Sequence, residues 1–318
     1  MNAIEITDFR KEYGTTVAVR GISLSVREGE LFGLIGPDGS GKTTTMRAVC
    51  TLLVPDAGTI LVQGLDTSRD VMRIRAVLGY MPQRFSLYQD LSVEQNLRFF
   101  ADLFRVPPAE RLEREEQLYR FSRLSEFKKR KAAALSGGMK QKLALSCALV
   151  HTPRVLVLDE PTTGVDPVSR REFWDILRSI QKQGTTILVS TAYLDEADRC
   201  DRVALMYRGR VVVSGAPSSV REGFSYPLYR LKGKDVRALQ AQFAAAAETR
   251  TTQLFGDALH VVFNVEPSES RWAEWRATSA GNLETWGRQP PSIEDVFMDL
   301  MSTQDEGAPG AAPAGARS

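Results

Sequence analysis

A glycine-rich segment carrying one lysine and two threonines is the first part of the sequence with a clear chemical meaning. Residues 36–44 read GPDGSGKTT and match the pattern GxxxxGK[ST], directly after an apolar run that predicts a strand. Glycines let a loop curl so that successive backbone N–H groups face the same anionic oxygens, and a following helix N-terminus adds positive potential. The segment therefore predicts a loop that holds nucleotide phosphates. An ordinary glycine-rich turn is the alternative, and the position between strand and helix argues against it.

The residues of this loop have distinct expected roles. Lys42 is expected to reach the β and γ phosphates, and Thr43 to place its hydroxyl on Mg²⁺. The other loop positions are expected to contact the phosphates, and they are Gly36, Pro37, Asp38, Gly39, Ser40, Gly41 and Thr44. The predicted ligands are therefore a nucleoside triphosphate and Mg²⁺.

A second apolar run ends in two adjacent carboxylates. Residues 155–160 read VLVLDE, as in the Walker B strand that accompanies such a loop. Asp159 is the predicted Mg²⁺ partner, acting through water, and Glu160 is the predicted general base for an attacking water. Alone, the run would fit any strand that ends at a polar loop. Together with the phosphate loop it predicts a site that hydrolyses a nucleotide.

Composition limits the class of protein. The chain has 318 residues and a formal net charge of +2, so nothing in its overall charge points to nucleic acid as a partner. Cys50, Cys147 and Cys200 lie far apart and form no CxxC pair, which fits a reducing compartment. Residues 1–10 lack the apolar core of a signal peptide, and no stretch approaches the ~20 apolar residues that span a bilayer. Any membrane role is expected to be peripheral.

The order of apolar runs predicts an α/β fold with a parallel core sheet over residues 1–220. The strongest strand signals are residues 31–35, 155–158 and 186–189, and residues 88–150 are mostly helical in pattern, which predicts a helical insertion. A basic run at residues 128–131 fits a solvated helix end, or contact with a permease or lipid headgroups.

The pattern of predicted strands and helices changes after residue 220. Residues 221–303 predict a small α+β domain, with strands at 226–231 and 258–265 and helices at 235–247 and 292–301. Residues 304–318 are rich in Gly, Ala and Pro and are expected to be a disordered tail.

Residues 135–141, LSGGMKQ, resemble the signature sequence of ABC ATPases, which separates this chain from other P-loop enzymes. The motif also suits phosphate recognition, because Ser136 offers a hydroxyl while Gly137 and Gly138 expose amides before a helix. Gln141 completes the motif. In the family the signature closes over ATP held by the opposite subunit, so the resemblance implies ATP as ligand and a pair of chains, as homodimer or heterodimer.

Other motifs follow the order found in the family. Tyr13 resembles the aromatic residue that stacks on adenine, with ordinary packing as the alternative. Gln83, in GYMPQ, resembles the glutamine that senses Mg²⁺ and γ-phosphate and takes part in catalysis. Asp166, in TTGVDP, resembles the aspartate of the dimer interface, with a simple turn residue before proline as the alternative.

The chain departs from the family at one position. A histidine that contacts γ-phosphate normally follows the strand after the interface aspartate, and the segment here reads TILVSTAYLDE, with Ala192 at that place. Losing one donor to a developing charge commonly costs about 2.7–4 kcal/mol in barrier height. We therefore expect a slow but competent ATPase, with Thr191 or Tyr193 as sources of a substitute hydroxyl.

The resemblance implies the ATP-binding and hydrolysing subunit of an ABC transporter. Residues 290–300, PPSIEDVFMDL, look like a segment of type-2 exporters, including drug exporters, so the cargo is expected to leave the cell. A transmembrane permease on a separate chain is the expected partner, placing this chain at the cytoplasmic face of the membrane. Its docking surface is expected near residues 84–97, with Phe85, Leu87 and Tyr88 as contacts or as local packing.

Two other functions remain open from sequence. A nucleotide-gated subunit with little hydrolysis would fit Ala192. A soluble ABC ATPase acting on ribosomes or chromosomes fits less well, because the chain has one phosphate loop and only a modest insertion. We expect no nucleic-acid partner.

Overall fold

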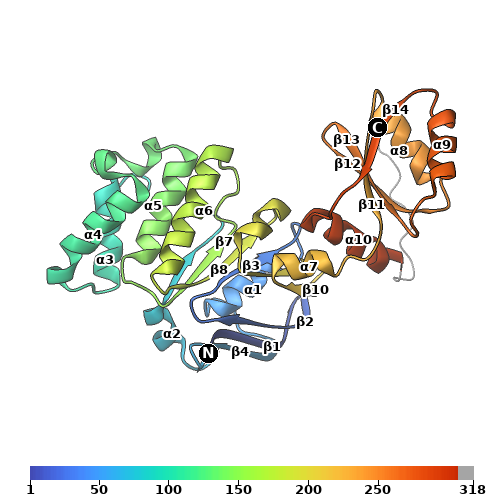
Figure 1. The fold of residues 1–318 in the computed structure, drawn as a ribbon. Helices are drawn as coiled ribbons and strands as arrows, with labels where there is room; N and C mark the ends of the chain where they lie inside the picture. The colour runs from blue at the N-terminus through green and yellow to red at the C-terminus, as the bar shows by residue number, and fades with distance from the viewer. Residues whose placement is uncertain (307–318) are drawn as a thin grey trace. The chain divides into compact units, whose positions relative to one another are not determined.

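The computed structural model describes residues 1–306, and the chain separates into two compact units, Met1–Pro217 and a second unit that begins at Ser218. Within the part of the chain described, no helix combines the length and apolar character needed to cross a membrane. Figure 1 shows the elements of each unit.

A six-stranded sheet in the order β10-β9-β3-β8-β7-β6 forms the centre of the first unit (Figure 1). Its strands are β3 (Leu31–Ile35), β6 (Leu78–Met81), β7 (Val155–Asp159), β8 (Thr186–Thr191), β9 (Arg202–Tyr207) and β10 (Arg210–Gly215). All pairs from β9 to β6 are parallel and only β10 is antiparallel. Every residue of β3, β7 and β8 is buried, as expected for strands covered on both faces. The predicted parallel core sheet is confirmed.

A second, antiparallel sheet in the order β2-β1-β4-β5 completes this unit and was not expected from sequence. Its strands are β1 (Asn2–Tyr13), β2 (Thr16–Arg27), β4 (Ala57–Val62) and β5 (Leu65–Asp66). The inner residues of this sheet, such as Phe9, and those of the central sheet, such as Phe32, share one apolar core with Met46 of α1 (Lys42–Val49). Helix α1 is thereby fixed at the point where the phosphate loop ends.

The segment between β6 and β7 is helical, as predicted. It contains α3 (Val93–Leu103), α4 (Pro108–Ser122), two 3-10 turns (Ser125–Phe127 and Ala132–Ala134) and α5 (Gly137–Leu149), while α2 (Val71–Val77) precedes β6 and α6 (Pro167–Lys182) follows β7. Ser92 begins α3 with a capping box that includes Gln95. The basic run follows the end of a 3-10 helix, where Lys128 is the C-cap residue and its ammonium lies 4.3 Å from the centroid of the Tyr119 ring, and residues 129–131 are exposed.

The second unit contains a four-stranded antiparallel sheet in the order β12-β13-β11-β14. Its elements are β11 (Leu228–Gly233), α8 (Val236–Ala244), β12 (Thr249–Phe255), β13 (Ala258–Phe263), α9 (Glu269–Thr278), β14 (Leu283–Arg288) and α10 (Ile293–Glu306), and α7 (Pro217–Glu222) precedes them. The strands and helices expected from sequence correspond to β11, β13, α8 and α10, whereas β12, α9 and β14 are additional. Phe243, Phe263, Trp272 and Trp275 lie in its core.

Helix α10 continues to Glu306, so the first residues of the expected tail are helical, and residues 307–318 lie outside the described part of the chain. Its position on the sheet depends on a buried polar pair, since His260 Nδ1 lies 2.8 Å from Asp295 Oδ1. Burial alone would raise the pKa of Asp295, but hydrogen bonds from His260 and Ser292 outweigh it and lower the pKa.

Candidate nucleotide-binding site

The predicted site residues gather at one edge of the central sheet. The phosphate loop follows β3, Glu160 follows β7, Ala192 follows β8 and Gln83 follows β6. Because these strands are parallel neighbours, their carboxyl ends meet at the same edge. The topology therefore brings together groups that are far apart in the sequence.

Close packing explains the glycines of the phosphate loop. A Cβ on Gly36 would lie 2.1 Å from Met206 O, and a Cβ on Gly41 would lie 2.6 Å from Ala18 O. Gly41 also has a φ of 107° and Gly39 a φ of 76°, in the region that L side chains rarely adopt. Gly36 N donates to Thr191 O at 3.2 Å, which joins the start of the loop to the end of β8.

Lys42 lies beneath this loop with its side chain 3% exposed. Its Nζ donates to Gly36 O at 2.7 Å and to Pro37 O at 3.0 Å. It also forms an ion pair with Glu160 Oε1 at 3.0 Å, and the Glu160 side chain is 5% exposed. The ammonium is therefore surrounded by oxygens and can exchange a carboxylate for a phosphate.

The two carboxylates after β7 differ in their surroundings. Asp159 Oδ1 accepts from Ser190 Oγ at 2.7 Å and from Thr43 Oγ1 at 3.2 Å, while Oδ2 is buried and has no hydrogen-bond partner in the structure. Burial raises the pKa of Asp159, and the hydrogen bonds from Ser190 and Thr43 oppose that effect. The unpaired oxygen is the kind of group that a cation would satisfy.

Glu160 uses its other oxygen, Oε2, to accept from Gln83 Nε2 at 2.9 Å and from Thr163 Oγ1 at 3.3 Å. Its φ is 49°, an uncommon value for a residue other than glycine and one that recurs at functional sites. Its backbone N–H donates to Ser190 Oγ at 2.9 Å, which supports that conformation. The structure thus joins Lys42, Gln83 and Glu160 in one network.

The remaining residues of the phosphate loop are placed around this network. Ser40 is buried and its Oγ has no hydrogen-bond partner in the structure, whereas Asp38 is exposed. Pro37, Thr43 and Thr44 are partly buried.

The signature residues lie apart from this network. Ser136 is exposed and caps α5, where its hydroxyl accepts from Met139 N at 3.3 Å. A Cβ on Gly138 would lie 2.7 Å from Ser169, so this glycine permits close approach of α6, whereas Gly137 has space around it. Gln141 is half-buried on α5. Among the described residues, no hydrogen bond joins Ser136 to the phosphate loop.

Tyr13 and Asp166 also lie outside the network. Tyr13 ends β1 and is 47% exposed, so its ring is accessible for stacking. Asp166 caps α6, and its Oδ1 accepts from Ser169 N at 2.9 Å and Val168 N at 3.1 Å. The hydrogen bond from Ser169 is the main cause of its lowered pKa. The cap explains an aspartate before Pro167 without any contact across an interface.

The loop after β8 shows where substitute hydroxyls would come from. Thr191 is buried, and its Oγ1 donates to Glu196 Oε2 at 2.6 Å, so this hydroxyl is already engaged inside the protein. Tyr193 is 37% exposed, and the Arg170 guanidinium lies 4.5 Å from its ring centroid. Of the two sources expected from sequence, only Tyr193 has an accessible side chain.

Sequence reasoning missed Ser190 and Glu196. Ser190 is buried at the end of β8 and contacts both the Asp159 side chain and the Glu160 backbone. The only signal was its place at the carboxyl end of a buried strand. Glu196 lies in the acidic segment YLDEAD, which reads as a solvated turn, and nothing in the sequence marks it as 3% exposed.

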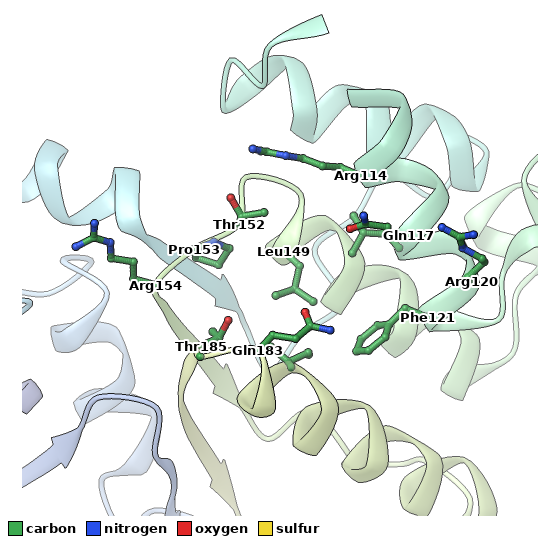
Figure 2. Close-up of a pocket in the computed structure, with 13 residues that line it drawn as sticks. Arg114, Gln117, Arg120, Phe121, Leu149, Thr152, Pro153, Arg154, Gln183 and Thr185 are labelled. Carbon is green, nitrogen blue, oxygen red and sulfur yellow. The ribbon is translucent and has the colours of Figure 1, made fainter. Parts of the chain in front are cut away.

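A cleft of about 920 Å³ lies elsewhere in this unit (Figure 2). Arg154 and Thr185, which line it, directly precede β7 and β8, so the cleft is at the amino ends of these strands. Arg114 and Phe121 of α4 border it from the helical segment. It is therefore at the opposite end of the sheet from Lys42 and does not belong to the nucleotide site.

A loop with a buried lysine, beside a strand that ends in two carboxylates on a parallel sheet, defines a P-loop NTPase fold. The sequence profile of the family described as ABC transporter matches residues 19–163. The solved structure of cbiO1 from Clostridium perfringens, described as part of the ABC transporter complex cbiONQ, aligns with a TM-score of 0.64 and 31% identity, over 69% of this chain and 90% of that one.

Two curated relatives extend the comparison. The Nod factor export ATP-binding protein I of Paraburkholderia xenovorans (strain LB400) is 37% identical over 305 residues, covering 95% of this chain and 98% of that protein. The probable multidrug ABC transporter ATP-binding protein YbhF of Escherichia coli (strain K12) is 43% identical over 218 residues, 69% of this chain, and the chain spans only 38% of that protein's length. The chain therefore belongs to the ATP-binding proteins of ABC transporters. Proteins of this family are ATPases that dimerise and act with a transmembrane component.

Proposed function

We propose that this chain hydrolyses ATP with Mg²⁺ and uses the cycle of dimer closure and opening to drive a separate permease that exports its cargo. The observation that supports this most directly is the buried Lys42 between the phosphate loop and Glu160. The names of the relatives, a Nod factor exporter and a probable multidrug transporter, favour export over import. The site of action would be the cytoplasmic face of the membrane.

The residues present fit a magnesium ion. Thr43 offers a hydroxyl, and Asp159 offers the buried Oδ2 that has no partner in the structure. Oxygen donors of this kind suit Mg²⁺, which is usually held by few protein ligands together with water and phosphate. Bound there, the ion would offset the negative charge of the phosphate oxygens. Gln83 lies across the site, where its amide already contacts Glu160.

Hydrolysis requires Glu160 to be released from Lys42. In the structure Oε1 pairs with the ammonium, and Oε2 accepts from Gln83 and Thr163, so both oxygens are engaged. A triphosphate in the loop would compete for Lys42, because its oxygens carry more charge than one carboxylate. Glu160 would then be free to take a proton from water. Nucleotide binding and activation of the base are coupled through this one ion pair.

A complete site requires a second chain. Ser136 and Gly137 are exposed, and among the described residues Ser136 makes no hydrogen bond to the phosphate loop of its own chain. Exposed amides and a hydroxyl at the start of α5 suit a phosphate of a nucleotide held by a partner. We favour two copies of this chain, and ATP would then stabilise the dimer by mass action.

The permease would dock on an apolar cleft next to Gln83. This cleft of about 780 Å³ lies between α2, α3 and the loop after β6, and Leu52, Met72 and Leu103 line it with exposed fractions of 53%, 75% and 60%. Exposed apolar side chains at a cleft commonly mark an interaction site. Of the residues expected from sequence, Leu87 lines the cleft but is 8% exposed, whereas Tyr88 is 51% exposed and packs edge-on against Phe99.

Purification from membranes tests this proposal. The tagged full chain should co-purify with an integral membrane protein, and Leu103→Glu should reduce that recovery about tenfold or more, because a charge would have to be buried in the interface. Leu112→Glu is a matched control, since Leu112 is 74% exposed on α4 and does not line the cleft. Equal recovery with both variants would place the permease elsewhere.

Measurements on the unmodified chain and on a variant at Ala192 distinguish a slow ATPase from a subunit that only binds nucleotide. We predict that Ala192→His leaves ATP turnover unchanged or raises it, because an imidazole there would add a donor near the γ-phosphate. Turnover of both proteins should be measured as phosphate release at saturating Mg-ATP. A large loss of ATP turnover in the variant would show that the loop does not accommodate a histidine at position 192. ATP-dependent dimerisation without phosphate release in the unmodified chain would favour the binding-only function.

A further inference from the structure

Glu196 is a buried carboxylate that joins segments from three parts of the site. It is 3% exposed, and it lies in the 3-10 turn Leu194–Arg199. Thr191 donates to its Oε2 at 2.6 Å, and Thr162 donates to its Oε1 at 3.0 Å and Oε2 at 3.3 Å. Arg170 Nε lies 3.8 Å from Oε1. A buried charge held by hydroxyls from separate loops is costly to disturb, because its partners would be left unpaired.

Each residue that contacts Glu196 lies close in the sequence to a residue of the candidate site. Thr162 follows Glu160 by two positions on the same loop, and Thr191 directly precedes Ala192. The carbonyl of Thr191 also accepts from Gly36 N at the start of the phosphate loop. Arg170 is on the first turn of α6, where its N–H donates to Asp166 O at 2.9 Å. One carboxylate thus contacts the loop that carries Glu160, the end of β8 beside Ala192 and the first turn of α6.

We propose, on the basis of the function proposed above, that Glu196 is a positioning residue for ATP hydrolysis, which holds Glu160 and the loop at Ala192 in place from inside the protein. With alanine at position 192, no imidazole fastens this loop to the γ-phosphate. The hydrogen bonds from Thr191 and Thr162 fix the loop instead. Glu196 does not touch the reacting atoms, so its effect is on the geometry of Glu160 rather than on nucleotide contacts.

Substitution of Glu196 tests the proposal in the full-length chain. Glu196→Gln keeps the shape but loses one acceptor, and Glu196→Ala removes both, so kcat should fall about tenfold and about a hundredfold, in the range that misplacement of a catalytic group produces. The KM for Mg-ATP should change by less than about threefold, since Gly36 of the phosphate loop is bound by the backbone carbonyl of Thr191 and not by the Glu196 carboxylate. Asp195→Asn is the matched control, because Asp195 also lies near Arg170, at 3.7 Å, but is 68% exposed. It should keep the unmodified kcat.

A second set of variants tests whether Glu196 positions Glu160 or only stabilises the fold. Thr191→Val and Thr162→Val remove the hydroxyls with little change of volume, and each should lower kcat. When either substitution is combined with Glu196→Gln, kcat should fall little further, because both changes remove the same hydrogen bonds. Unchanged kcat in both Glu196 variants overturns the proposal. So does a parallel loss of kcat, nucleotide affinity and thermal stability, which would make Glu196 only a structural residue. Absence of Mg-ATP turnover in the unmodified chain would instead count against the proposed function.

Discussion

Replacing Glu160 with glutamine is expected to lower ATP turnover by about a hundredfold to ten-thousandfold, the usual contribution of a general base. Glutamine has nearly the same shape and can still accept from Gln83 and Thr163 through its carbonyl oxygen, so the loop should stay in place. Only the proton acceptor and the ion pair with Lys42 are lost. Phosphate release at saturating Mg-ATP measures the effect.

The same variant should bind ATP as tightly as the unmodified chain, or more tightly. Lys42 would no longer have to leave a carboxylate in order to contact phosphate, so a competing interaction disappears. A titration with a fluorescent ATP analogue measures this affinity. Glu172→Gln is a suitable control, because Glu172 pairs with Lys142 and Arg123 away from the site. Equal turnover in Glu160→Gln and the unmodified chain would discard Glu160 as the base.

Sequence predicted the parts of the site that follow from local patterns. The runs that became β3, β7 and β8 are short and rich in branched apolar residues, and each predicted run is followed by a polar or glycine-containing segment. Parallel strands end at one edge, so the phosphate loop, Asp159 and Glu160 had to be near one another. The fold class follows from the same reasoning, because strands of this kind need helices on both faces.

The antiparallel sheet escaped prediction for a physical reason. Strand β1 pairs with β2 through several register shifts, among them one between Ile6 and Phe9. Each shift breaks the alternation of buried and exposed residues, and the alternation is the main sequence signal of a half-buried strand. Strands β12 and β14 were missed for a related reason, because TRTTQLF and LETWGR contain mostly polar residues, which are largely partly buried in β12 and largely exposed in β14.

Long-range polar contacts could not be predicted from the sequence either. A glutamate in YLDEAD gives no sign that Glu196 is buried against Thr162 and Thr191, since acidic segments of this kind are usually solvated. The same holds for the pairing of Lys42 with Glu160. Motifs give the types of residues present in the site, whereas the structure shows how they are engaged before nucleotide arrives.

Lys42→Met is expected to reduce ATP affinity strongly and also to destabilise the protein. The ammonium contacts Gly36 O, Pro37 O and Glu160, and its removal leaves Glu160 buried without a counter-ion. Breaking a buried ion pair from one side typically costs about 3–5 kcal/mol in the free energy of unfolding. Urea denaturation of the unmodified chain and the variant measures this difference.

The double variant Lys42→Met/Glu160→Gln separates the two effects. Glutamine carries no charge, so the buried position no longer needs a counter-ion, and the double variant should recover most of the stability lost in Lys42→Met. ATP binding should not recover, because the phosphate contact of Lys42 is still missing. A double variant as unstable as Lys42→Met would mean that the loop depends on the ammonium contacts to Gly36 and Pro37 rather than on the ion pair. Restored ATP binding would show that Lys42 does not contact the phosphates.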